Sequence, residues 1–132
     1  MIRVLFVCVH NSARSQMAEG LARHFGGSNI EVFSAGSQPT DVHPFAVRVM
    51  DEIGIDISGQ FSKSFSDVAG QRFDFVITLC GEGELSCPVF PGKYKRLHWP
   101  LPDPSAVKGT VENRLVVFRD VRDELSERIK TL

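Results

Sequence analysis

The sequence has few cysteines, no long apolar segment and almost no net charge, and each shortage excludes a class of protein. The longest uninterrupted apolar run covers residues 4–9, whereas a membrane-spanning helix needs about 18 apolar residues in succession. The first apolar stretch lacks the basic leader and the small-residue cleavage site of a secretory signal, so we expect a cytoplasmic protein. The 15 basic and 16 acidic side chains give a net charge of −1, which offers no basic surface to nucleic acid.

Only three cysteines are present, Cys8, Cys80 and Cys87. An odd number without a secretory leader argues against a disulfide framework and for reactive, metal-bound or buried thiols in a reducing compartment. A structural zinc site usually pairs its cysteines at close spacing, and the sequence has no Cys-x2-Cys pair. The four histidines show no metal-ligand spacing either, so we predict no metal site.

Apolar residues make up 42% of the 132 residues and charged residues 23%, as in a typical globular protein, and the length predicts one domain over residues 1–132. Short apolar runs predict strands over residues 2–7, 31–34, 73–79 and 95–99. Apolar positions at helical spacing predict helices over 15–25, 45–53 and 111–129, and residues 62–70 predict a loop with a short helix. Alternating strands and helices predict an α/β fold, a three-layer sandwich with a central four-stranded parallel sheet flanked by helices. Active sites of such sheets lie at the carboxyl ends of the strands.

The loop after the first strand carries the strongest chemical signal, a Cys-x5-Arg spacing from Cys8 to Arg14. A loop of this length can turn its N–H groups inward as an anion cradle, and the following helix adds its positive end. Arg14 can bind two oxygens of a tetrahedral anion, and Ser15 can donate its hydroxyl to the sulfur, so Cys8 is expected as a thiolate near neutral pH. Asn11 suits a position that needs positive φ. The predicted oxyanion-binding residues are Val9, His10, Asn11, Ser12, Ala13, Arg14 and Ser15.

The alternative interpretation of this loop is a buried Cys8 that acts as a small hydrophobe, followed by a solvated Arg14. The position of the spacing, between a buried strand and an amphipathic helix, favours a nucleophile aimed at a bound phosphate-like anion.

The run from Cys8 to Glu19, Cys-Val-His-Asn-Ser-Ala-Arg-Ser-Gln-Met-Ala-Glu, resembles the phosphate-binding loop of the low-molecular-weight protein tyrosine phosphatases. It is still more similar to the loop of the arsenate reductases that share their fold, because the phosphatases usually have Pro where this chain has Gln16. The resemblance continues through residues 34–36, 54–58, 76–81, 98–99 and 103–104. His10 and Ala13 depart from the pattern, since many relatives have Gly and Cys there.

The resemblance implies roles for three further residues. It makes Asp103 of the Asp-Pro pair the general acid, whereas from the residues alone this pair is equally a simple turn. It makes Cys80 and Cys87 the second and third thiols of a Cys8–Cys80–Cys87 disulfide relay regenerated by thioredoxin. Two inert loop thiols are the alternative. Electrons then come from thiols, so no metal or organic cofactor is expected.

A cation site behind the loop is also implied. Asn11, Glu19 and Ser34 match positions that surround a potassium ion in some reductases of this family. Lys63 stands where those relatives have Asp, so we expect its ammonium group to replace the ion and activity to be independent of potassium. The alternative is a merely solvated Lys63.

The expected activity is therefore thioredoxin-dependent reduction of arsenate, with phosphate or sulfate as mimics, by a monomer. A low-molecular-weight protein tyrosine phosphatase acting through a phosphocysteine intermediate is the alternative. Against it stand Gln16 and the single tyrosine, Tyr94, because many of these phosphatases have an aromatic residue after Asp-Pro, where this chain has Ser105. A non-catalytic oxyanion or redox sensor is a third possibility, and glutaredoxin and mycothiol stay open as reductants.

Overall fold

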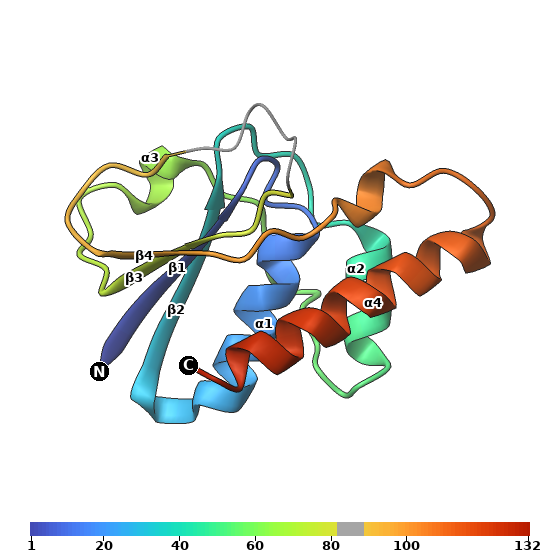
Figure 1. Ribbon diagram of the computed structural model, residues 1–132, viewed down its shortest axis with the longest axis horizontal. Coiled ribbons are helices and arrows are strands. Elements are labelled where there is room, and N and C mark those ends of the chain that lie inside the picture. Colours follow the sequence, from blue (N-terminus) through green and yellow to red (C-terminus); the bar gives the residue numbers. More distant parts are fainter. Residues whose placement is uncertain (82–88) are drawn as a thin grey trace.

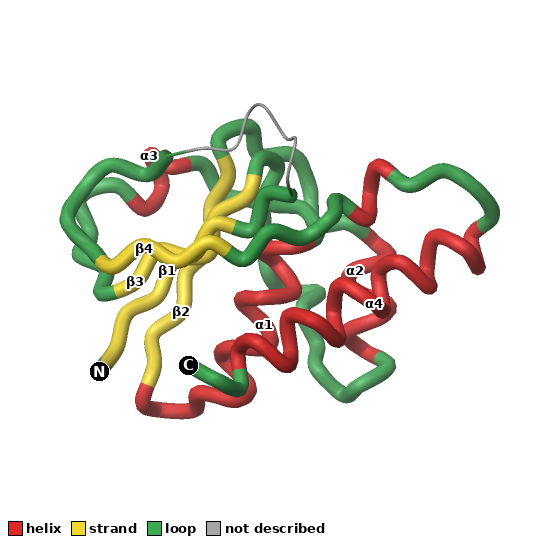
Figure 2. Tube along the Cα trace, in the orientation of Figure 1, coloured by secondary structure: helices red, strands yellow, loops and turns green. Residues whose placement is uncertain are grey.

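A computed structural model describes residues 1–81 and 89–132. Its centre is a four-stranded parallel sheet in the order β2-β1-β3-β4 (Figures 1 and 2). The strands are β1 (Ile2–Cys8), β2 (Ile30–Gly36), β3 (Phe75–Thr78) and β4 (Lys95–His98). The predicted sheet is confirmed, and its parallel direction brings the carboxyl ends of all four strands to one edge.

Three helices cover one face of this sheet (Figure 1). They are α1 (Arg14–Gly26), α2 (Pro44–Asp51) and α4 (Val111–Ile129). The inner face of α4 is apolar, since Leu115, Phe118, Val121, Leu125 and Ile129 are all buried. These side chains pack with Val4 and Phe6 of β1 in the larger apolar core.

The other face has a smaller core under thinner cover. Leu5 and Val7 point into it, because successive side chains of a strand alternate between faces. The one-turn helix α3 (Phe65–Val68) lies here, as the sequence predicted for residues 62–70. Edge-to-face contacts join the rings of Phe65, Phe73 and Phe90 at centroid separations of 5.3 and 5.7 Å. Helices therefore flank both faces, but unequally.

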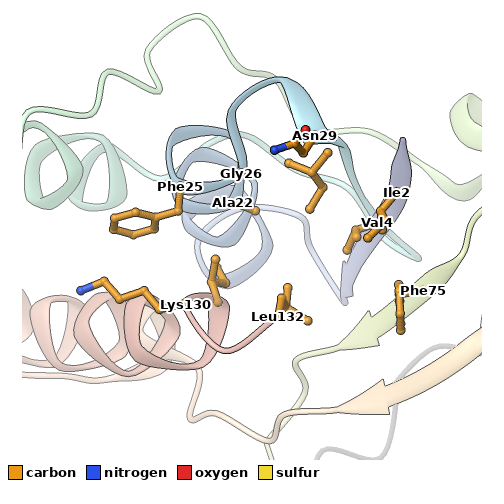
Figure 3. A pocket seen from close by; sticks show the side chains of 11 residues that line it. Ile2, Val4, Ala22, Phe25, Gly26, Asn29, Phe75, Lys130 and Leu132 are labelled. Atoms are coloured by element: carbon orange, nitrogen blue, oxygen red, sulfur yellow. The ribbon is translucent and has the colours of Figure 1, made fainter.

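The amino ends of the strands hold a large cavity of about 490 Å³ (Figure 3). Apolar side chains of β1, β3, α1 and the end of α4 form most of its wall, among them Ile2, Phe75, Phe25 and Ile129. Lys130 contributes the ammonium group nearest to it, with Nζ 5.2 Å from the centroid of the Phe25 ring. In the described parts of the chain, the helices are too short or too polar to cross a membrane.

Candidate active site

The loop between β1 and α1 is held close to the end of β2. Asn11 adopts φ of 47°, the left-handed conformation predicted for it. A Cβ atom on Gly36 would lie 2.5 Å from the carbonyl oxygen of Val9 and 2.8 Å from the nitrogen of Asn11. Any larger residue at position 36 would therefore push the loop away, and glycine is required there for steric reasons.

The backbone of this loop is oriented by its neighbours. Four neighbouring groups donate hydrogen bonds of 2.7–3.1 Å to the carbonyl oxygens of residues 9–12. Gln38 N donates to residue 9, Thr40 N to residue 10, Ser62 Oγ to residue 11 and His43 N to residue 12. A trans peptide points its carbonyl and the following N–H in opposite directions. The N–H groups of residues 10–13 consequently point away from these donors. This is the arrangement that an anion cradle requires.

The Cys8 thiol lies at the carboxyl end of β1 and is buried. Its Sγ is 2.8 Å from Ser15 Oγ. Asn11 Nδ2 donates to the same oxygen at 2.7 Å. Because Ser15 Oγ accepts that bond, its own hydrogen is available to the sulfur.

Arg14 begins α1 and is 3% exposed. Its Nη1 donates to the carbonyl oxygens of Leu79 and Leu101 at 3.3 and 3.1 Å. Its Nη2 lies 3.9 Å from Asp103 Oδ2. The guanidinium therefore joins the end of β3 to the loop after β4, and it brings the predicted acid beside the predicted nucleophile.

Asp103 caps the short 3-10 helix η2 (Pro104–Ala106). Its Oδ1 accepts hydrogen bonds from the backbone nitrogen and the hydroxyl of Ser105, at 3.0 and 2.6 Å. These bonds hold Oδ1, while Oδ2 is the oxygen on the side of Arg14. Sequence reasoning missed this role of Ser105, although Asp-x-Ser is a common side-chain turn pattern.

These groups surround a pocket of only about 10 Å³, close to the space that one water molecule needs. Its lining consists of Cys8, His10, Ser12, Ala13, Arg14, Asp103 and Ser105. A small anion suits this volume better than an extended ligand.

His43 lies at the N-cap of α2, and its Nδ1 accepts from Phe45 N at 3.0 Å. Burial lowers the pKa of His43, and the positive charge of Arg114 lowers it further, while Asp103 opposes both. A neutral ring is what the capping bond needs, because a protonated Nδ1 could not accept it.

A buried polar network lies behind the loop. Gln16 Nε2 donates to Asn11 Oδ1 at 2.9 Å, and Gln60 Nε2 donates to Gln16 Oε1 at 2.7 Å. Sequence reasoning used Gln16 only to distinguish two families and missed Gln60. The identity of Gln16 was the available signal, because a proline could not make these bonds.

The predicted ammonium group is present in the same region. Lys63 Nζ lies 3.4 Å from Glu19 Oε1, which also accepts from Ser34 Oγ at 2.5 Å. Arg23 Nη2 donates to the other oxygen of Glu19 at 3.0 Å. Lys63 is therefore paired rather than merely solvated, and independence of potassium stays a prediction.

The second thiol follows β3. The register pairs Val7 with Thr78, so Cys8 and Cys80 lie just beyond the last pair of two adjacent strands. Both thiols are buried. Cys87 lies outside the described residues. Within the described ranges, no three His, Cys, Asp or Glu side chains gather closely enough to hold a metal ion.

A buried thiol after a parallel strand, N–H groups turned inward and an arginine at the helix start define a phosphate-binding-loop enzyme of the α/β class. The family model described as low molecular weight phosphotyrosine protein phosphatase matches residues 3–132. The chain belongs to this family.

Its relatives within the family include arsenate reductases. The chain is 46% identical to the arsenate reductase of Halalkalibacterium halodurans, over 97% of this chain and 92% of that protein. It is 42% identical to the glutaredoxin arsenate reductase of Synechocystis sp., over 100% and 96%. Similar solved structures include an arsenate reductase in its oxidized state, with 41% identity, a TM-score of 0.84 and coverage of 100% and 96%. A thioredoxin-dependent arsenate reductase of Corynebacterium glutamicum has 36% identity and a TM-score of 0.67, covering 99% of this chain and 63% of that one.

Proposed function

We propose that this protein reduces arsenate to arsenite, with Cys8 as the nucleophile. The observation that carries the proposal is the convergence of the Cys8 thiol, the Arg14 guanidinium and the Asp103 carboxyl group on one small pocket. Arsenate reductase relatives that match nearly the whole chain support reduction over ester hydrolysis. The buried network of Gln16 supports it as well, because the phosphatases usually have proline at that position.

The first step replaces a hydroxyl group of arsenate by sulfur. Arsenate binds to N–H groups of residues 9–15 and to Arg14, where phosphate or sulfate would also bind. The Cys8 thiolate attacks arsenic, an S–As bond forms and one As–O bond breaks. Asp103 donates the proton with which the departing hydroxyl leaves as water. The hydroxyl of Ser15, 2.8 Å from the sulfur, stabilises the thiolate before the attack.

The second step transfers the electrons. The Cys80 thiolate attacks Sγ of Cys8, and the electron pair of the S–As bond goes to arsenic. As(V) becomes As(III) and leaves as arsenite, while Cys8 and Cys80 are oxidised to a disulfide. The neighbouring strand ends that carry these two residues support this order.

The third step restores the nucleophile. Cys87 attacks Cys80, the Cys8 thiolate is released, and a Cys80–Cys87 disulfide remains. Thioredoxin then reduces that disulfide, so no metal or organic cofactor takes part. This relay requires a compartment that keeps thiols reduced, and we therefore place it in the cytoplasm.

A coupled assay tests the proposal. Oxidation of NADPH is followed with thioredoxin, thioredoxin reductase and arsenate for the wild type, Cys87→Ser and Cys8→Ser. Steady turnover is expected for the wild type, one turnover for Cys87→Ser and none for Cys8→Ser. A parallel assay with glutathione and glutaredoxin identifies the reductant, because only the physiological type supports steady turnover.

The same proteins also test the phosphatase alternative, because a phosphatase would use the same loop chemistry as the reductase. Efficient hydrolysis of p-nitrophenyl phosphate that is unchanged in Cys87→Ser, without arsenate-dependent NADPH oxidation, would overturn the proposal. Weak hydrolysis that depends on Cys8 alone is compatible with reduction as the main activity.

A further inference from the structure

His10, in the loop between β1 and α1, is a pocket residue whose side chain the chemistry described above does not use. Among the described non-glycine residues, positive φ occurs at Asn11 alone. The backbone of His10 is therefore unstrained. The residue is half-buried and is among those that line the pocket, with Cys8, Arg14 and Asp103. An imidazole group therefore belongs to a residue at the edge of the anion pocket.

The ring is held in one orientation by the segment after β2. His10 Nδ1 lies 3.0 Å from the carbonyl oxygen of Gln38. Because a carbonyl oxygen only accepts, Nδ1 carries the hydrogen of this bond. The acceptor is itself fixed: Gln38 N donates to the Val9 carbonyl at 2.8 Å, Thr40 N donates to the His10 carbonyl at 3.1 Å, and Pro39 restricts the backbone between them.

This bond determines what the second ring nitrogen offers to an anion. In the neutral ring Nδ1 holds the only hydrogen, so Nε2 presents a lone pair, which repels an oxyanion. In the protonated ring Nε2 becomes a charged N–H donor, which attracts one. A ring without the Gln38 contact could change tautomer and donate in both states. The contact therefore enlarges the difference in oxyanion affinity between the neutral and the charged form of the ring.

We propose that His10 is an anion-binding residue at the mouth of the site and that its protonation makes oxyanion affinity increase as the pH falls. This inference rests on the proposed oxyanion site but not on its turnover. His10 determines which protonation state of the protein captures the anion, whereas Arg14 holds the anion in both states.

The charged groups around the ring come from each neighbouring element. The thiolate of Cys8 and the guanidinium of Arg14 lie on the loop and on α1, and the carboxylate of Asp103 lies on the segment after β4. Residues 36–40 beside the ring carry no charge, and Asp41 and His43 follow them. The negative groups favour the imidazolium and Arg14 opposes it.

Sulfate is the appropriate probe, because it stays a dianion throughout this range whereas arsenate itself titrates. Its dissociation constant is measured by calorimetry at pH 5.5 and 8.0 for the wild type and for His10→Gln, which keeps a polar side chain without the charge. His24→Gln serves as the matched control at an exposed histidine. The change in the dissociation constant between the two pH values is compared among the three proteins. The contribution of the Cys8 thiolate cancels in this comparison, because all three proteins share it.

The dissociation constant at pH 8.0 is divided by that at pH 5.5. This ratio is expected to be about five- to tenfold larger for the wild type and His24→Gln than for His10→Gln. His10→Gly, the residue found in many relatives, is expected to behave like His10→Gln and provides a second variant. Equal ratios in all proteins, or no sulfate binding to the wild type at pH 5.5, would overturn the inference. A ratio that depends on His10 in a protein that does not reduce arsenate would overturn the reductase proposal alone.

Discussion

The pockets at the two ends of the sheet differ both in volume and in the chemical groups that line them. The amino end holds a cavity of about 490 Å³ with a mostly apolar wall, and the carboxyl end holds a pocket of about 10 Å³. The smaller space is the one that collects a thiol, a guanidinium and a carboxyl group. Convergent reactive groups therefore identify the site here, and the size of the cavity does not.

The direction of the strands explains this difference. In a parallel sheet every strand delivers its following loop to the same edge, so residues far apart in the sequence meet there. Cys8 follows β1, Cys80 follows β3 and Asp103 follows β4. The opposite edge holds strand beginnings and the ends of α1 and α4, whose side chains there are mostly apolar (Figure 3).

The largest effect is expected from removing the proton donor at the carboxyl end. Asp103→Asn keeps the shape of the side chain and its bonds to Ser105, but an amide cannot protonate a leaving hydroxyl. The kcat for arsenate reduction should fall about 10²- to 10⁴-fold, with little change in melting temperature. A loss below threefold in a rapid-quench measurement would contradict the role of the acid and weaken the contrast between the ends.

The next prediction tests the amino end by its stability. Ile129 is 5% exposed beside the large cavity, so Ile129→Ala should lower the free energy of unfolding by about 2–4 kcal/mol. The kcat/KM for arsenate at 20 °C should stay within twofold of the wild type. Val116→Ala, on the same helix but 50% exposed, is the control and should change neither quantity. A tenfold loss of turnover in Ile129→Ala would show that the two ends are coupled.

A smaller effect is expected behind the loop between β1 and α1. The wild type should reduce arsenate at the same rate in potassium and in sodium chloride of equal ionic strength, because the Lys63 ammonium already pairs with Glu19. Lys63→Met removes that charge and leaves a buried carboxylate with less compensation, so kcat/KM should fall by a few fold. Lys108→Met, at an exposed position, should match the wild type. Activation of the wild type by potassium would refute the assignment of Lys63.

The smallest effect belongs to an ion pair remote from both ends. Hydrogen bonding to Arg119, followed by that to Arg122, lowers the pKa of Glu52 from 4.5 to about 2. A lowered carboxyl pKa stabilises the fold above the unfolded value and loses that contribution as the pH falls towards 2. Glu52→Gln should therefore lower the melting temperature slightly at pH 7 and progressively less from pH 4.5 downwards. Glu127→Gln, an exposed control, should show no such trend.

The order of elements was predictable because it depends on local patterns. Short apolar runs located all four strands, and apolar positions at helical spacing located the three longer helices, with small shifts at their ends. Cys8 and Arg14 could be paired because one loop carries both. The 3.9 Å approach of Asp103 to Arg14 could not follow from local patterns, since it depends on the loop after β4 returning to α1, and only the family resemblance indicated it.

Other features depended on packing that no local pattern contains. The bonds of Gln60 to Gln16 and of Ser105 to Asp103 join side chains whose polar character alone fits any surface position. The cavity at the amino end was also not predicted, because the same apolar residues would suit a filled core. These features depend on how segments that are distant in the sequence pack together, and only the complete fold brings those segments into contact.

The outward carbonyl groups of residues 9–12 have a thermodynamic consequence. Their hydrogen bonds to neighbouring segments fix the loop during folding, so the conformational entropy of ordering it is lost at that stage. An arriving anion then meets N–H groups that already converge and does not have to order them itself. Preorganisation of this kind reduces the entropic cost of binding, and it lets a pocket of a few atoms hold a strongly hydrated ion.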